Sequence, residues 1–331
     1  MDTVTRRQVL KLIGVGTGMS LAQGVVAAPL LAQTHTRLSI GTALTKGVFY
    51  PLGVGMAALI SKYIPGVEAT AEVTGGSKEN VKLLQAGKVQ LALVVPDIAW
   101  EAARGELKDL AEKVAVRTLL ATYSNYLHIV TLEGSGIRTV ADLKGKRVSM
   151  GPAAGGSGGV GLLVFEASGV MPQDLGSHLR LDYPESAAAL REGKLDAFLM
   201  NTGLRAGVIR ELATTPGTKM RLIPHGDAAP KLAAKHPFYF AAPIPKGTYP
   251  GVDEDISAIA ATALFVAHER MEEPLAYEIT KLTLERADEL VAAHAVAKEI
   301  TLQSAVRGSP IPFHPGALRY YKEKGVTVPP A

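Results

Sequence analysis

The feature of this sequence that most constrains its fold is a glycine loop at residues 151–159, which reads Gly-Pro-Ala-Ala-Gly-Gly-Ser-Gly-Gly. The loop follows a short apolar run at 147–150 and precedes a helical pattern at 160–168, on which Leu163, Val164 and Ala167 share one side. This order predicts a strand, a glycine loop and a helix. Such a loop directs several backbone N–H groups at one point and places a helix N-terminus behind them. That combination attracts anions such as phosphate or carboxylate.

The same design occurs earlier in the chain. A strand predicted at 37–40 leads into a loop at 41–47, and a helix follows from about Pro51. A second internal repeat relates residues 84–93 to residues 190–199. Each of these two segments predicts a helix end, a glycine C-cap and a buried strand. The repeat predicts two similar lobes that hold a ligand between them.

Composition excludes several classes of protein. The chain has 331 residues and 47% apolar composition, which is enough for a sizeable core in one or two domains. The net charge of +4 includes +2 from residues 1–32, so the remainder is too weakly basic to indicate nucleic-acid binding. The chain has no cysteine, and its eight histidines form neither an i, i+4 pair nor an HExxH motif. We therefore expect no disulfide, no metal site and no cofactor.

The N-terminus has the pattern of an export signal. Arg6 and Arg7 form a twin-arginine motif, and a weakly apolar stretch follows from residue 12 to about 28. The glycines in that stretch favour a twin-arginine-type signal over a membrane anchor, which is the alternative. We expect the signal to cover residues 1–32, with cleavage after Ala28 or Ala32, and the mature protein to be periplasmic.

The rest of the chain predicts an α/β fold. Strands alternate with helices from residue 38 to 223, with strands expected at 116–123 and 127–132 among others. Helical spacing of apolar residues predicts two closing helices at 255–270 and 274–294. We expect a two-lobed fold with mostly parallel sheets, in which residues 33–128 begin lobe I, 129–230 form lobe II, and 231–331 return to lobe I. Hinges are expected near 122–132 and 224–243.

Ligands of open α/β sheets bind beyond the carboxyl ends of the strands. That rule selects the loops at 42–50, 74–80, 96–97, 155–159 and 201–205, which are rich in Gly, Thr, Ser and Asn and poor in paired carboxylates and histidines. Such loops suit recognition of a small polar or anionic solute better than acid–base chemistry, so we expect no catalytic residue. The predicted ligand-binding residues are Thr42, Thr45, Tyr50, Thr74, Gly75, Gly76, Ser77, Asn80, Asp97, Gly156, Ser157, Gly158 and Asn201.

Two of these residues have alternative interpretations. Ser157 lies in a G-x-S-x-G pattern between a strand and a helix, which is the context of a hydrolase nucleophile. A triad would also need an acid and then a histidine downstream. Asp196 and His225 are available, but their sequence contexts are ordinary. Asp97 has two interpretations, as a partner for a ligand amine or as a cap for the following helix.

Four segments together resemble a known family. Gly41-Thr42, Gly47 and Phe49-Tyr50-Pro51-x-Gly53 resemble the opening motif of the solute receptors of tripartite ATP-independent periplasmic (TRAP) transporters, TAXI subfamily, and Thr74-Gly75-Gly76-Ser77-x-x-Asn80 resembles their second motif. The segments that begin at Ile244 and at His314 are similar to the C-terminal signatures, and the segment at His314 is the most specific of the four. The resemblance covers essentially all of the mature region.

The resemblance implies a type II periplasmic-binding-protein fold without catalytic activity. Members deliver a small solute, such as glutamate, glutamine or 2-oxoglutarate, to a TRAP membrane permease. The positions of the motifs imply that the cleft is lined by Thr42, Tyr50, Thr74, Gly75, Gly76, Ser77, Asn80, Asp97 and Ser157. The loop at 43–46 is less glycine-rich than in the family, and residues 201–205 also depart from its pattern, which puts the ligand's identity in doubt. The alternatives are a secreted serine hydrolase using Ser157 and a periplasmic sensor module.

Overall fold

The computed structural model describes residues 36–108, 110 and 112–330, so the predicted export signal lies outside the described residues. Within them, ten strands form one sheet. The strands are β1 (Thr36–Gly41), β2 (Val67–Glu72), β3 (Leu91–Val94), β4 (Val116–Leu132), β5 (Arg147–Ser149), β6 (Ser177–Leu179), β7 (Ala197–Thr202), β8 (Met220–Leu222), β9 (Phe240–Ile244) and β10 (Ile256–His268). The helices are α1 (Phe49–Tyr63), α2 (Ser77–Gln85), α3 (Pro96–Arg104), α4 (Ser157–Ala167), α5 (Tyr183–Arg191), α6 (Gly207–Thr214), α7 (Ala229–Ala233), α8 (Glu273–Glu285), α9 (Ala287–Leu290) and α10 (Pro315–Glu323).

The sheet contains the same arrangement twice. Its order is β2-β1-β3-β10-β4-β7-β5-β6, so β2-β1-β3 beside β10 corresponds to β6-β5-β7 beside β4. We call β2-β1-β3 the first half-sheet and β6-β5-β7 the second half-sheet. The pairs inside each half-sheet are parallel, as predicted, and every antiparallel pair involves β4 or β10.

The internal repeat of residues 84–93 and 190–199 is also present in the structure. Helix α2 is followed by Gly87 and strand β3, and helix α5 is followed by Gly193 and strand β7. Both glycines adopt the left-handed conformation, with φ of 70° and 69°. A left-handed residue after the last helical turn is the usual way to end a helix and is least costly for glycine. The prediction of two matching helix–glycine–strand units is therefore confirmed.

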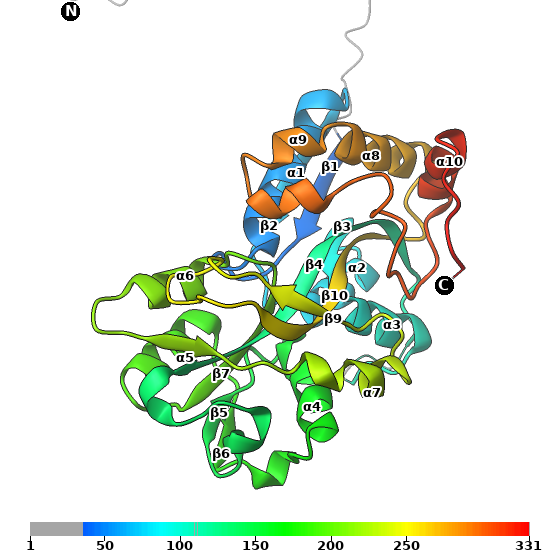
Figure 1. Ribbon diagram of the computed structural model, residues 1–331. Helices are drawn as coiled ribbons and strands as arrows, with labels where there is room; N and C mark the ends of the chain where they lie inside the picture. The colour runs from blue at the N-terminus through cyan, green and yellow to red at the C-terminus, as the bar shows by residue number, and fades with distance from the viewer. Residues whose placement is uncertain (1–35, 109, 111, 331) are drawn as a thin grey trace, which may run out of the picture. The chain divides into compact units, whose positions relative to one another are not determined.

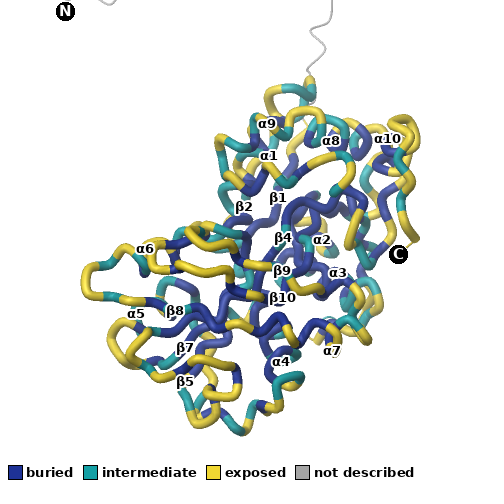
Figure 2. Tube along the Cα trace, viewed as in Figure 1, coloured by how far each residue is buried: buried dark blue, intermediate teal, exposed yellow. Residues whose placement is uncertain are grey.

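The predicted helix at 255–270 is wrong, because these residues form strand β10. Almost every residue of β10 is buried, and Figure 2 shows β4 and β10 as dark, buried segments between the two half-sheets. A strand that is covered on both faces has no alternation of polar and apolar residues, so its apolar residues can mimic helical spacing. The strands predicted at 116–123 and 127–132 are similarly one long strand, β4.

Strands β4 and β10 connect the two half-sheets. Residues 264–267 of β10 pair with β3, whereas residues 126–131 of β4 pair with β7. The two strands pair with each other, with an irregularity between Thr262 and Leu264, where the Thr122 hydroxyl donates a hydrogen bond of 2.8 Å to the Ala263 carbonyl. The second connection between the half-sheets therefore lies in β10. The hinge expected near 224–243 stays a prediction.

The C-terminal helices pack near helix α1, which lies against the first half-sheet. Helices α8 and α9 pack against α1, and α10 packs against α8 (Figure 1). The predicted helix at 274–294 is divided into α8 and α9.

A buried histidine joins β4 to the chain before β10. His128 Nδ1 lies 3.0 Å from the Tyr126 carbonyl oxygen and 3.2 Å from that of Met200, so Nδ1 carries the proton. Its Nε2 then accepts a hydrogen bond of 3.0 Å from the Tyr249 hydroxyl. Burial lowers the pKa of His128 to about 4, so the ring is neutral at pH 7.

We expect Tyr249→Phe to lower the free energy of unfolding by about 1–3 kcal/mol, because it leaves His128 Nε2 buried without a donor. Denaturant unfolding at pH 7 measures this change. The matched control is Tyr63→Phe, which removes a hydroxyl that donates to Glu289 near the surface and should cost less than about 1 kcal/mol. Equal losses of unfolding free energy in the two variants would contradict the hydrogen bond from Tyr249 to His128.

Candidate functional site

A cavity lies where the loops of the two half-sheets meet. Its free volume is about 30 Å³, which is room for two or three waters. The structure is therefore a closed form with a small internal space. The lining residues are Ala43, Leu44, Gly47, Val48, Phe49, Gly75, Gly76, Ser77, Val95, Tyr123, Asn125, Gly155, Gly156, Tyr183, Asn201 and Thr202.

The glycine loop at 151–159 touches the loop at 74–80 of the other half-sheet beside this cavity. The Lys78 amide donates a hydrogen bond of 3.0 Å to the Ala154 carbonyl, which joins the loop of one half-sheet to that of the other. A Cβ atom on Gly75 would lie 2.7 Å from Ala154 Cβ, and one on Gly156 would lie 2.6 Å from Val95 Cγ2. Both separations are too short for carbon atoms, so this closed contact requires glycine.

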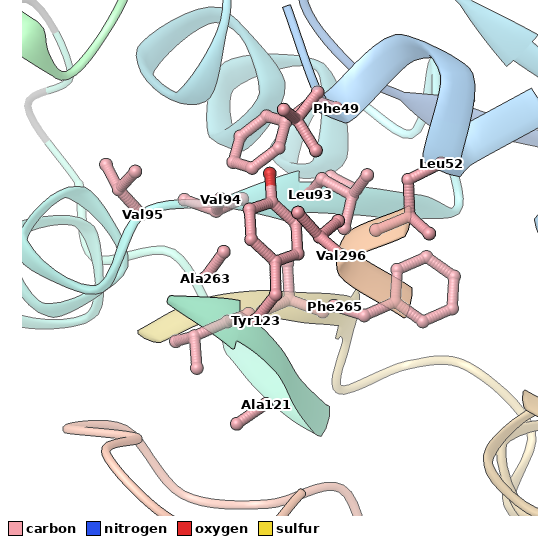
Figure 3. Packing of buried hydrophobic residues seen from close by; sticks show 14 of the residues in the cluster. Phe49, Leu52, Leu93, Val94, Val95, Ala121, Tyr123, Ala263, Phe265 and Val296 are labelled. Atoms are coloured by element: carbon pink, nitrogen blue, oxygen red, sulfur yellow. The ribbon is translucent and has the colours of Figure 1, made fainter. Parts of the chain in front are cut away.

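Two residues that line the cavity carry buried polar atoms that have no hydrogen-bond partner among the described residues. They are Asn125 Nδ2, Asn125 Oδ1 and Tyr123 Oη, and both side chains are 1% exposed. Figure 3 shows the Tyr123 ring among apolar side chains, with its hydroxyl directed toward Phe49. Unpaired buried polar groups are costly. Six further atoms of this kind, on Gln85, Asp97, His225, His236, Tyr239 and His314, belong to residues that do not line the cavity.

Ser157 supports the second side of the cavity. Its hydroxyl oxygen accepts a hydrogen bond of 2.9 Å from the Asn201 amide and lies 2.9 Å from the Tyr183 hydroxyl. Burial raises the pKa of Tyr183, so its hydroxyl is neutral at pH 7. Among the described residues, neither hydrogen-bond partner of Ser157 is a histidine, the residue that activates the serine of a catalytic triad.

Five of the sequence-predicted ligand-binding residues line the cavity: Gly75, Gly76, Ser77, Gly156 and Asn201. The Gly75 amide donates to Glu79 Oε2 at 2.7 Å, and the Gly76 amide donates to Thr74 Oγ1 at 3.1 Å. The Ser77 hydroxyl accepts a hydrogen bond from the Val95 amide. These bonds hold the backbone of the loop in place beside the cavity.

Three predicted residues lie behind the cavity in a buried hydrogen-bond network. The Asn80 amide donates to the carbonyl oxygens of Thr42 at 2.7 Å and Leu93 at 2.8 Å. The Thr74 hydroxyl lies 3.0 Å from the Thr42 carbonyl and 2.8 Å from Asn80 Oδ1. The structure thus places Thr42, Thr74 and Asn80 where they tie together the chain after β1, the loop before α2 and strand β3.

The remaining predicted residues are not among those that line the cavity. Thr45 is exposed and Tyr50 is half-buried. Gly158 is buried and lies against the guanidinium of Arg180. Asp97 lies on α3, where one carboxyl oxygen faces Gly159 and the other has no hydrogen-bond partner among the described residues.

Asn125, Tyr183 and Thr202 line the cavity although the sequence analysis did not single them out. Of these three residues, the sequence could have indicated Asn125 alone, because burial of an amide inside a long apolar strand costs free energy unless the amide has a hydrogen-bond partner. Tyr183 and Thr202 have no distinctive sequence context. Their role depends on β7 and α5 meeting the loop at 155–157.

Asp97 has an unusual environment. Burial raises the pKa of its carboxyl group to about 7, the nearby charge of Glu101 raises it further, and the Tyr239 hydroxyl opposes the shift. Asp97 and Tyr239 come from different parts of the chain, on α3 and just before β9. The carboxyl group is therefore largely protonated below pH 7, which favours its burial.

The described residues contain no group of three or more histidine, aspartate or glutamate side chains that is placed to hold a metal ion. Among the described helices, none has both the length and the apolar character needed to cross a membrane.

Residues 40–325 match the model of the NMT1-like family, and the chain belongs to this family. The fold is also similar to solved structures. One, from Bordetella bronchiseptica, has a TM-score of 0.53 at 16% identity and covers 87% of this chain and 89% of its own. A putative L-cystine ABC transporter from Listeria monocytogenes has a TM-score of 0.50 at 16% identity, with coverage of 80% and 95%. Tv2483 bound to L-arginine has a TM-score of 0.50 at 15% identity, with coverage of 81% and 91%. At these identities the likeness establishes the fold alone, and the predicted periplasmic-binding-protein-like α/β fold is confirmed.

We expect Asp97→Asn to stabilise the protein more at pH 8 than at pH 4. The folded-state pKa of Asp97 is raised above its unfolded value, so the folded protein binds more protons between about pH 4 and 7 and loses stability as pH rises through that range. Removing the carboxyl group should recover up to about 4 kcal/mol at pH 8 and little at pH 4. Denaturant unfolding at the two pH values measures the difference.

The control for this prediction is Asp196→Asn. The hydrogen bond from Arg147 lowers the pKa of Asp196, so its contribution to stability is present above about pH 4 and is lost below it. This variant should lose stability at pH 8 rather than gain it. An equal change in the free energy of unfolding of Asp97→Asn at both pH values would contradict a raised pKa of Asp97.

Proposed function

We propose that this protein is an extracytoplasmic receptor that binds a small organic solute in the cavity between its half-sheets and delivers it to a membrane permease. The observation that carries the proposal is the cavity where the loops of the two half-sheets meet, which is lined by Asn125 and Tyr123. A cavity at such a junction, lined by apolar side chains and a few hydrogen-bonding groups, is the usual form of a small-molecule site.

The solved structures of similar fold support this class of function. The Listeria protein is titled a putative L-cystine ABC transporter, and Tv2483 was solved with L-arginine. Both titles concern small solutes. The motifs that resemble TAXI receptors suggest, in addition, that the membrane partner is a TRAP-type permease and that the solute is related to glutamate, glutamine or 2-oxoglutarate.

Within this proposal the predicted site residues divide into three groups. Gly75, Gly76, Ser77, Gly156 and Asn201 contact the solute, together with Tyr123, Asn125 and Tyr183. Thr42, Thr74, Asn80 and Ser157 hold these groups in position through the hydrogen bonds described above. Thr45, Tyr50, Asp97 and Gly158 lie outside the cavity lining in the closed form.

The proposed location is the periplasm, which follows from the twin-arginine motif at Arg6 and Arg7. Cell fractionation tests it, and replacement of both arginines by lysine should retain the protein in the cytoplasm. Periplasmic delivery of the doubly substituted chain would show that another signal directs export.

The serine hydrolase alternative has less support. Ser157 is hydrogen-bonded to Tyr183 and the Asn201 amide, and no histidine in the described part of the chain hydrogen-bonds to it. We expect a fluorophosphonate probe to leave Ser157 unlabelled. Stoichiometric labelling of Ser157 would favour a hydrolase.

We expect Asn125→Leu to abolish solute binding while leaving the unliganded protein at least as stable. Leucine is similar in size to asparagine and removes a buried amide that has no partner. The thermal shift of the purified protein against a broad library of organic acids, amino acids and sugars measures binding. A solute at 100 times its Kd should stabilise the wild-type protein by about 2.7 kcal/mol. Retained binding by Asn125→Leu would remove Asn125 from the site.

We expect Gly156→Ala to weaken solute binding by preventing closure, because the added Cβ would lie 2.6 Å from Val95 Cγ2. Small-angle scattering with saturating solute should show compaction of the wild-type protein but less compaction of the variant. Gly134→Ala is the matched control, since a Cβ there meets no atom within 4 Å. Equal affinities in the two variants would show that the glycine contact is not needed for closure.

A further inference from the structure

Helix α3 forms a contact between the two halves of the protein, each of which is a half-sheet with its helices. The helix follows β3 of the first half-sheet. Its Trp100 nevertheless packs against the hydrophobic cluster that contains Phe165 and Leu199 of the second half. The Trp100 ring lies edge-on to His236, with centroids 5.5 Å apart, and 6.2 Å from Phe238. Both partners lie in the segment between α7 and β9, next to α3 (Figure 1).

The first turn of α3 also touches the first turn of α4 in the second half. A Cβ atom on Gly156 would lie 3.8 Å from Ile98 Cγ1, and one on Gly159 would lie 3.5 Å from Asp97 Oδ2. These are van der Waals separations, so the two helices are in contact. Asp97 is 5% exposed. Because Gly159 and Tyr239 of the second half face its carboxyl group, a separation of the halves would expose that group to water.

The Asp97 carboxyl group has no cation paired with it among the described residues. Asp97 Oδ1 and the nearby Tyr239 hydroxyl oxygen both lack a hydrogen-bond partner there. The charge that acts on Asp97 is the negative charge of Glu101, one turn along α3. Burial of an ionised carboxyl group without a cation is strongly unfavourable, whereas a protonated carboxyl group is neutral and is buried at much lower cost.

The other charged and titratable groups around this contact do not supply the missing cation. Lys78 of α2 acts on Glu101. Burial and the charge of Lys235 lower the pKa of His236, which favours its neutral form.

The elements from the second half add no ion pair to Asp97. The first turn of α4 contains no acidic or basic residue. The guanidinium of Arg180 lies against Gly158, and it makes no ion pair with Asp97 in the described part of the chain. The N–H groups of Asp97 and Ile98 favour the charged carboxyl group, and burial outweighs them.

We propose that protonation of Asp97 controls closure of the two halves. The protonated carboxyl group lets α3 pack against α4 and the segment 236–239, and ionisation of that group drives the halves apart. This inference rests on the closure that the proposed receptor function requires, and it does not depend on the identity of a solute. It makes closure, and with it retention of a solute, stronger in acidic surroundings.

The pH range follows from the two states of the carboxyl group. In the closed form burial raises the pKa of Asp97 to about 7, whereas an aspartate in contact with water titrates near pH 4. The closed form therefore binds more protons between about pH 4 and 7, so opening becomes more favourable as the pH rises through that range. The ratio of open to closed molecules should rise by up to about 10-fold per pH unit and become constant above about pH 8.

The fluorescence of Trp100 tests this proposal, because Trp100 is the single tryptophan of the chain. Separation from His236 and Phe238 exposes its ring to water. We expect the emission maximum to lie at longer wavelength, and acrylamide to quench more strongly, at about pH 8 than at about pH 5. Asp97→Asn keeps the shape of the side chain without a titratable group, so its emission should match that of the closed form at both pH values.

Three variants identify the group that titrates. His236→Gln should keep the pH-dependent shift, although His236 touches the Trp100 ring. Tyr239→Phe removes a hydroxyl that favours the charged form of Asp97, so it should move the midpoint of the shift to higher pH. Asp196→Asn removes a carboxylate that pairs with Arg147 and should keep the wild-type profile. Circular dichroism establishes that each variant is folded.

A distance measured between the halves makes the result independent of Trp100. The chain has no cysteine, so Glu68→Cys and His178→Cys together place two spin labels on β2 and β6, at opposite ends of the sheet order. Pulsed electron paramagnetic resonance should show a second distance whose population grows as the pH rises. The second distance should be absent when Asp97→Asn is added.

Emission and distances that do not change with pH in the wild-type protein would overturn the proposal. A shift that persists in Asp97→Asn, or one that is lost in His236→Gln, would assign the proton to another group and would also overturn it. These measurements need no solute, so their failure leaves the receptor function intact. Conversely, an absence of binding by every solute in the broad library would remove the receptor function without changing the expected response to pH.

Discussion

The closed form of this protein depends on a backbone contact between two glycine loops. The hydrogen bond from the Lys78 amide to the Ala154 carbonyl joins loops that belong to different half-sheets. Side chains larger than hydrogen at Gly75 or Gly156 would occupy the space of Ala154 or Val95. Because the loops meet backbone to backbone, the helices behind them bring their N-termini to the same small cavity.

The two half-sheets that carry these loops are built alike, and the long strands between them set their spacing. Strands β4 and β10 pair with each other and with a different neighbour on each side. Asn125 and Tyr123 lie near the middle of β4. The residues that follow them pair with β7, whereas the residues that precede them pair with the part of β10 that also pairs with β3. The connection between the halves is therefore also a wall of the cavity, so a movement of the strands would be felt directly by a bound solute.

Buried polar groups in this protein fall into two classes. The network of Thr42, Thr74 and Asn80 is fully hydrogen-bonded, and His128 is satisfied on both ring nitrogens. Such groups fix the fold, because breaking one bond leaves a buried atom without a partner. Asn125 and Tyr123 have no side-chain partner among the described residues, and the same holds for six buried polar atoms elsewhere. Among the residues at the cavity, the contrast separates those that support it from those that would face the proposed solute, although all of them are buried to a similar degree.

The sequence by itself determined the repeated strand–loop–helix units, their glycine C-caps and the position of the binding loops. These features depend on local rules, since glycine at a left-handed turn and loops at the carboxyl ends of strands are encoded within a few residues. The same local rules misassigned β10 as a helix, because a strand buried on both faces has no polar side to reveal its period. Only the tertiary structure decided which polar residues face the cavity. Thr42, Asn80 and Asn125 are all buried polar side chains near the binding loops, and the difference between support and solute contact lies in partners that are distant in the chain.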